Sequence, residues 1–249
     1  QIMRYFIGNW KMFGVPKSIN ILNKINYFHS KDVNRKKYTV IITPPYTLIE
    51  TYAKHFKNKH ISIGSQNCYQ KDKFSSNTAA VSPFMIKSVG AKYTLIGHSD
   101  NRSEGETDHM LKQKVYFAIK NNLKVVFCIG ENKIEKKTNK TFNVLKKQIK
   151  NVLDKKINEN NIIVAYEPIW SIGTGKIPTK SELKKTTTHI KKVLKAIFRK
   201  KVPAVLYGGS VDGNNVEMLK EIKEIDGFLI GGASKSAKKF IDIIKNYYR

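Results

Sequence analysis

Three side chains in this sequence are of types that could together move a proton at a carbon next to a carbonyl group. Lys11 offers a cation for a phosphate or for a developing oxyanion, and His98 can donate to a carbonyl oxygen or shuttle protons. Glu167 offers a carboxylate, and Pro168 directly after it restricts the backbone there. A carboxylate base, an imidazole and a cation are the parts that proton abstraction beside a carbonyl requires.

Two glycine pairs late in the sequence could bind an anion. The first lies within Gly208–Ser210 and the second is Gly231-Gly232. Because glycine has no Cβ, backbone N–H groups at such positions can approach an anion closely. Each pair could also be a plain turn. In a chain that carries the three side chains above, they favour a phosphorylated substrate.

The elements that must position these groups are short apolar runs separated by helix-length segments. Most of the runs are nearly continuous in apolar residues, which is typical of parallel strands covered on both faces. The expected strands are Arg4–Gly8, Tyr38–Thr43, His60–Gly64, Tyr93–Gly97, Lys124–Gly130, Ile162–Tyr166, Ala204–Tyr207 and Phe228–Gly231. An amphipathic pattern over Glu182–Phe198 illustrates the helices between them.

Eight strands alternating with helices over 249 residues predict an α/β fold, a single-domain (β/α)8 TIM barrel covering residues 1–249. A doubly wound sheet would show fewer units, and no GxGxxG follows the first strand. Barrel enzymes carry their catalytic groups where strands end and loops begin. Lys11, His98, Glu167 and both glycine pairs follow expected strands, so we expect them at one end of the barrel.

Six motifs in this order resemble the signatures of the triosephosphate isomerase family: GNWKM, LIGHSD, CIGE, AYEPIWSIGTGK, LYGGSV and DGFLIGGAS. The resemblance runs from about Met3 to Ile244. It implies an aldose–ketose isomerase of glycolysis and gluconeogenesis. Such an enzyme interconverts dihydroxyacetone phosphate and D-glyceraldehyde 3-phosphate through an enediolate. It also implies a homodimer that needs neither a metal nor an organic cofactor.

The resemblance assigns a role to each matching residue. Glu167 is the base, His98 polarises the carbonyl and moves protons between the oxygens, and Lys11 holds the charge of substrate and enediolate. Asn9 orients its neighbours and adds a hydrogen bond. The phosphate donors match Gly173, Ser210, Gly231 and Gly232, and the supporting positions match Asp100, Arg102, Cys128 and Tyr207. Pro168–Lys176 matches a lid that excludes water and protects the enediolate.

The sequence departs from the family pattern at the position that normally contacts the catalytic lysine and in loop three. Asp100 stands where the family has Glu, and Asn101 stands where it has Arg. The Thr-Gly-Glu of the family's third loop is Thr78-Ala79-Ala80 here. Both halves of an ion pair between subunits are therefore missing together, and we expect a weakened dimer.

A further departure lies at the end of the lid. Pro178 replaces a residue whose backbone N–H bonds to the family's tyrosine, here Tyr207, when the lid closes. Proline has no N–H. We therefore expect one hydrogen bond fewer in the closed lid, with more of the enediolate lost as methylglyoxal.

The formal charge of +27 raises the alternative of an inactive barrel that serves as a basic scaffold or nucleic-acid binder. Only five of the 46 basic residues are arginines, and the lysines are spread over helix-like segments. Codons rich in A and T would produce the same abundance of Lys, Asn and Ile. We therefore expect no nucleic-acid partner. Another isomerase of a phosphorylated sugar on this barrel is a third hypothesis.

No apolar run approaches the roughly 18 residues of a membrane helix, so we expect a soluble protein without a membrane partner. Cys68 and Cys128 are too few for a disulfide framework, which favours a reducing compartment. The sequence begins at Gln1 without a signal-like stretch. The expected location is the cytoplasm or, for a processed chain, a plastid-type organelle.

Overall fold

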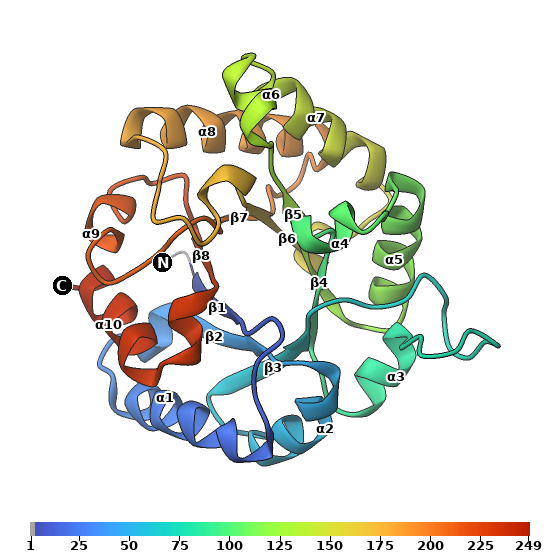
Figure 1. The fold of residues 1–249 in the computed structure, drawn as a ribbon, viewed down its shortest axis with the longest axis vertical. Helices are drawn as coiled ribbons and strands as arrows, with labels where there is room; N and C mark the ends of the chain where they lie inside the picture. Colours follow the sequence, from blue (N-terminus) through green and yellow to red (C-terminus); the bar gives the residue numbers. More distant parts are fainter. Residues whose placement is uncertain (1–2) are drawn as a thin grey trace.

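The computed structural model describes residues 3–249 and forms a closed barrel of parallel strands in the order β1 to β8, with β8 paired to β1. The strands are β1 (Arg4–Asn9), β2 (Tyr38–Thr43), β3 (Ile61–Ser65), β4 (Tyr93–Ile96), β5 (Lys124–Ile129), β6 (Ile162–Tyr166), β7 (Ala204–Tyr207) and β8 (Gly227–Ile230). Figure 1 shows the helices as an outer ring around them. The predicted (β/α)8 fold is confirmed.

Helices fill most of the connections between successive strands. The α-helices are α1 (Ile19–Lys31), α2 (Tyr46–His55), α3 (Pro83–Ser88), α4 (Ser99–Ser103), α5 (Asp108–Lys120), α6 (Lys133–Lys137), α7 (Thr141–Val152), α8 (Lys180–Ile197), α9 (Val216–Leu219) and α10 (Ala237–Tyr247). The 3-10 helices are η1 (Pro16–Ser18), η2 (Arg35–Lys37), η3 (Glu159–Asn161), η4 (Ile169–Ser171) and η5 (Gly232–Lys235). Between β3 and α3 the chain extends away from the barrel (Figure 1).

Alternate side chains of each strand serve two different cores. One cluster, which includes Ile7, Ile41 and Leu206, fills the barrel interior. Their neighbours, such as Phe6 and Val40, belong to a larger cluster packed under the helices. Both faces of the strands are therefore dry, which explains why the strand sequences are apolar throughout.

The observed strand ends lie within one residue of the predicted ones. The helix predicted over Glu182–Phe198 begins two residues earlier, at Lys180, because Thr179 and Glu182 form a capping box. The Thr179 hydroxyl accepts from the Glu182 amide at 3.2 Å, and the Glu182 carboxylate accepts from the Thr179 amide at 2.9 Å. Over the described span 3–249, no helix is long and apolar enough to cross a membrane.

Candidate active site

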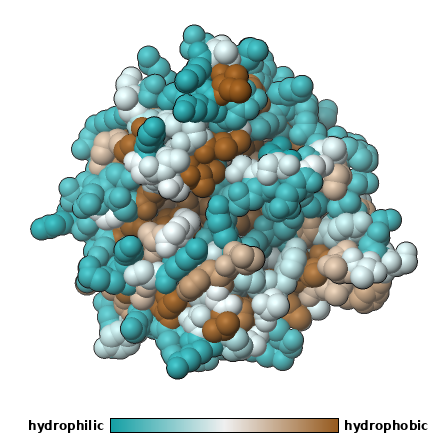
Figure 2. Space-filling view, in the orientation of Figure 1, coloured by the Kyte–Doolittle hydropathy of each residue, from teal (hydrophilic) through white to brown (hydrophobic). Residues whose placement is uncertain are grey.

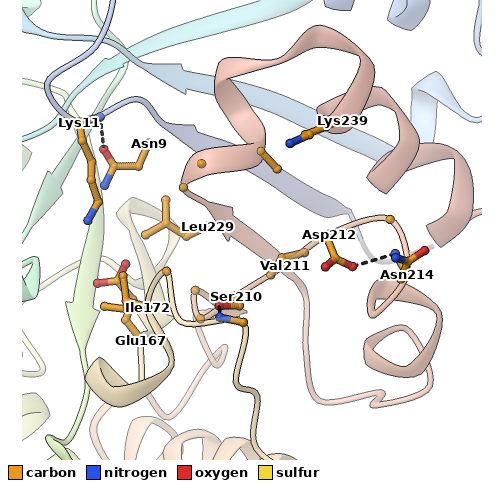
Figure 3. A pocket seen from close by; sticks show the side chains of 18 of the residues that line it. Asn9, Lys11, Glu167, Ile172, Ser210, Val211, Asp212, Asn214, Leu229 and Lys239 are labelled. Atoms are coloured by element: carbon orange, nitrogen blue, oxygen red, sulfur yellow. Dashed lines mark hydrogen bonds between the residues drawn. The ribbon is translucent and has the colours of Figure 1, made fainter.

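A cavity of about 930 Å³ lies at the carboxyl ends of the strands. Figure 2 shows the matching hollow at the centre of this face. The cavity is lined by Asn9, Lys11, His98, Glu167, Gly173, Ser210, Gly231 and Gly232, among others. Figure 3 shows Lys11 and Glu167 reaching into the same space beside Leu229. Residues predicted from five different strand ends therefore share one site.

The carboxylate and the imidazole contact each other directly. Glu167 Oε1 lies 3.2 Å from His98 Nε2, and both side chains are about 95% buried. The Glu167 amide donates to the Ile129 carbonyl at 2.7 Å, which continues the β5–β6 ladder beyond the strand end and fixes the base. His98 follows β4 through Gly97, whose φ of 79° turns the chain toward the cavity.

Two opposing influences act on His98. Burial lowers its pKa, whereas the carboxylates of Glu167 and Asp100 raise it by more, so the net direction is upward. The Asp100 amide, at the start of α4, donates to His98 Nδ1 at 3.1 Å. A nitrogen that accepts an N–H carries no proton, so this contact favours the neutral ring. We assign the neutral tautomer with its hydrogen on Nε2, facing Glu167.

Lys11 is held in an unusual backbone conformation. Its φ of 55° is in the left-handed region, which a non-glycine residue occupies only at a cost of order 1 kcal/mol. The Asn9 side chain accepts from the Lys11 amide at 3.1 Å, and the Gln66 side chain donates to the Lys11 carbonyl at 2.8 Å. These two contacts stabilise the turn and direct the ammonium toward the cavity. Sequence reasoning missed Gln66, because only the fold brings the residue after β3 across the end of β2 to the loop after β1.

The shorter Asp100 still reaches the lysine. Its Oδ2 lies 3.1 Å from Lys11 Nζ, so the contact expected of the family's Glu is also made by Asp. Behind it, the partly buried Arg102 donates to the Gly97 carbonyl at 2.6 Å and to the Cys128 carbonyl at 2.9 Å. Arg102 therefore joins the ends of β4 and β5. Burial raises the pKa of the Cys128 thiol well above its ordinary value, which keeps it protonated.

The glycines predicted to bind phosphate leave open space at the cavity. A Cβ added at Gly173, Gly231 or Gly232 would meet no heavy atom within 4 Å, so their backbone groups are accessible. η5 begins at Gly232, and the Trp10 indole donates to the Ser234 carbonyl at 3.0 Å. The loop after β8 is thereby fixed against the end of β1.

The predicted lid, Pro168–Lys176, is fastened to neighbouring loops. The Gly175 amide donates to Ser210 Oγ at 3.1 Å, as expected from the sequence. Ser210 Oγ in turn donates to the Ser171 carbonyl at 2.7 Å. The Trp170 indole donates to Glu131 at 3.2 Å, and the Lys136 ammonium lies 3.6 Å from the centre of the Trp170 ring.

The structure differs from the sequence prediction at Tyr207. With Pro178 at the end of the lid, its hydroxyl was expected to lack a partner there. Instead, Tyr207 Oη lies 3.1 Å from the hydroxyl of Ser171. Sequence reasoning placed Ser171 within the lid without giving it a role. No local signal identifies the contact, because residues 171 and 207 meet only through the pairing of β6 with β7.

In loop three, which contains Thr78-Ala79-Ala80, an alanine adopts a backbone conformation that favours glycine. Ala79 stands where the family has Gly, and its φ is 65°. Ala in this region is strained by about 1 kcal/mol. Ala80 and Asn101 carry no charge, so neither can form the ion pair between subunits that the resemblance implies. In the range 3–249, no group of three or more His, Cys, Asp or Glu side chains is arranged to hold a metal ion.

Comparisons with known proteins agree with this geometry. The family model described as Triosephosphate isomerase matches residues 4–247. Proteins of that name from Thermodesulfovibrio yellowstonii and Debaryomyces hansenii are 35% and 37% identical to this chain. The alignments cover 97% and 98% of the chain and 98% of each relative. The crystal structure of triosephosphate isomerase from Bartonella henselae superposes with a TM-score of 0.90 at 32% identity, covering 99% of both chains. This chain belongs to the triosephosphate isomerase family.

Proposed function

We propose that Glu167, His98 and Lys11 carry out the interconversion of dihydroxyacetone phosphate and D-glyceraldehyde 3-phosphate, a step of glycolysis and gluconeogenesis. The observation that carries this assignment is the 3.2 Å contact between Glu167 and His98, both buried at one cavity wall. A carboxylate at this position, with a neutral imidazole as its neighbour, suits proton transfer between adjacent carbons.

The reaction proceeds in two proton transfers at carbon. The Glu167 carboxylate takes a proton from the carbon next to the carbonyl, and the C–H electron pair forms the enediolate. His98 donates from Nε2 to the developing oxyanion, while the Lys11 ammonium stabilises its charge. The protonated Glu167 then returns the proton to the neighbouring carbon. His98 moves the remaining proton between the two oxygens, so no proton is gained or lost.

The phosphate of the substrate would bind at the opposite side of the cavity. Backbone N–H groups at Gly173, Gly231 and Gly232 and the Ser210 segment supply donors there. With the phosphate fixed, the carbon chain is oriented toward Glu167. Holding the reacting groups in place in this way can lower the activation free energy by up to about 7–11 kcal/mol.

The test is a coupled isomerase assay on the purified protein beside its Glu167→Gln variant. The amide has nearly the shape of the carboxylate and cannot accept a proton from carbon. We expect measurable turnover in the wild type and a loss of at least about 1,000-fold in the variant. Equal kcat in the two proteins would remove Glu167 from the mechanism.

We further infer a homodimer formed through the segment between β3 and α3. Large apolar side chains near this segment and near the loop after β1 are exposed, led by Met12 at 99% and Phe74 at 77%. Val15, Tyr46 and Met85 are exposed in the same regions. Such a set of apolar side chains favours burial against a second copy.

We expect neither a nucleic-acid partner nor a membrane partner. Lysines lie on α1, α7, α8 and α10, helices that stand around the whole barrel, so they are not confined to one face. Cys68 and Cys128 are both buried as free thiols. Free thiols fit a reducing compartment such as the cytoplasm or a plastid-type organelle.

A further inference from the structure

The hydroxyl of Ser171 is fully buried between the end of the lid at Lys176 and Tyr207 of β7. The Ser171 side chain has no solvent exposure. The Oγ atom makes a short hydrogen bond to the Lys176 carbonyl, at the far end of the lid. It also lies 3.1 Å from Tyr207 Oη and 3.4 Å from the Ser210 amide nitrogen.

The directions of these three hydrogen bonds follow from the number of protons. A serine hydroxyl has one hydrogen to donate and two lone pairs that accept. Because the Lys176 carbonyl can only accept, the Ser171 hydrogen points there. Tyr207 must then donate to Ser171, and the Ser210 amide donates as well. Burial raises the pKa of Tyr207 to about 12, so its phenol keeps the proton that this requires.

The backbone beside this hydroxyl pair leaves room for it. A Cβ at Gly209 would lie 2.2 Å from Tyr207 Oη and 2.6 Å from Ser171 Oγ, so no other residue fits there without separating the pair. The backbone of Ser171 makes a second connection, because its carbonyl accepts a hydrogen bond from Ser210 Oγ. Ser210 Oγ in turn accepts a hydrogen bond from the Gly175 amide. Ser171 thus connects the lid to the loop after β7 through both its side chain and its backbone.

We infer that Ser171 is a positioning residue whose hydroxyl holds the lid closed through Tyr207, in place of the backbone donor that Pro178 lacks. The inference rests on the proposed isomerase function. Ser171 touches neither the substrate nor the reacting atoms, and it acts by keeping residues 171 and 176 together against β7. Removing its hydroxyl leaves the Tyr207 phenol and the Lys176 carbonyl without this partner. We expect the closed lid to be disfavoured by about 3- to 10-fold.

The experiment compares the wild type with Ser171→Ala, Tyr207→Phe and the double variant. Hydrogen exchange of the peptide that spans residues 172–177 is measured with the site saturated by 2-phosphoglycolate, a phosphorylated carboxylate that resembles the enediolate. Methylglyoxal formed per triose converted is measured in parallel. We expect Ser171→Ala to increase both by about 3- to 10-fold, while exchange in β2 and β5 stays unchanged. Ser171→Cys keeps the volume, lacks the hydroxyl, and should behave like Ser171→Ala.

The double variant tests whether the two hydroxyls act as one unit. If they do, hydrogen exchange of the lid and methylglyoxal per triose converted in the double variant exceed the values for Ser171→Ala by less than about twofold. Unchanged lid exchange in Ser171→Ala, or effects of the two substitutions that multiply, would overturn the inference. A wild type without isomerase activity would instead overturn the proposed function. Lid exchange is measured without turnover, so the two failures can be told apart.

Discussion

A methyl group added at Gly208 would press directly on the proposed base. The Cβ of Gly208→Ala would lie 2.7 Å from Glu167 Cγ and 3.4 Å from its Oε1. On its other side, Leu229 Cβ is 3.3 Å away. Leu229 belongs to the packed interior of the barrel, so the new methyl group cannot move in that direction. The Glu167 side chain is therefore the part that moves.

The size of this displacement sets the expected loss of activity. Carbon atoms in contact are separated by about 3.5–4.0 Å, so Glu167 Cγ must shift by roughly 1 Å. A misplacement of about 1 Å can cost about 100-fold in rate, or about 2.7 kcal/mol in the activation free energy. We expect kcat to fall by this factor. KM should change little, because the glycines proposed to bind phosphate are not displaced.

The assay is steady-state isomerase kinetics with thermal unfolding as a check, since overpacking commonly costs about 1–3 kcal/mol of stability. Gly213→Ala is the matched control. Its Cβ would meet only the Asn246 amide nitrogen at 3.2 Å and Asp242 at 3.6 Å, both on α10, and the Asn246 end can move. It should retain kcat within about twofold. A folded Gly208→Ala protein with more than a third of the wild-type kcat would refute the assignment of Glu167 as a base whose position depends on contact with Gly208.

Four further predictions concern the base, the histidine beside it, the lid and the dimer. Glu167→Asp should lower kcat by around 100-fold with little change in KM, measured in the same assay. Glu167→Gln should lower the pKa of His98, followed by NMR, because the carboxylate that raises it is gone; an unchanged titration would contradict the contact. Because folding raises the pKa of His98, protonation of this residue stabilises the folded state. This contribution to the free energy of unfolding is fully present below the unfolded-state pKa and is lost as the pH rises through the folded-state pKa. Pro178→Ala should reduce methylglyoxal per turnover more in the Ser171→Ala background than in the wild type, because only there does Tyr207 lack a lid partner; equal effects would contradict this. The proposed dimer of subunits with charge +27 should weaken at low ionic strength, and a salt-independent dimer at nanomolar concentration in sedimentation would contradict it.

The sequence predicted the parts of the site that depend on strand ends. Lys11, His98 and Glu167 each follow an apolar run, and parallel strands in a barrel bring such positions to one end. The early start of α8 was also readable, because Thr179 and Glu182 have capping-box spacing. The apolar pattern alone places the start of this helix two residues too late.

Contacts between loops could not be predicted in the same way. The bond from Gln66 to Lys11 joins residues 55 positions apart, and the Ser171–Tyr207 pair joins residues 36 apart. Neither follows from hydrophobic periodicity, because each depends on the separation and side-chain direction of two loops. The loss of an N–H at Pro178 was visible in the sequence. The hydrogen bond between the Ser171 hydroxyl and Tyr207 becomes apparent only when β6 and β7 are paired in the fold.

The pairing of β8 with β1 has a consequence for how the protein is made. Asn9 and Lys11 are synthesised more than 200 residues before Gly231 and Gly232, yet both pairs line the cavity. Until β8 emerges from the ribosome, β1 and β7 each present an unpaired edge, which is prone to associate with other strands. A nascent chain that has reached α9 already contains the proposed base and imidazole but not the second glycine pair of the proposed phosphate site. The cavity is therefore complete only when the ring of strands closes.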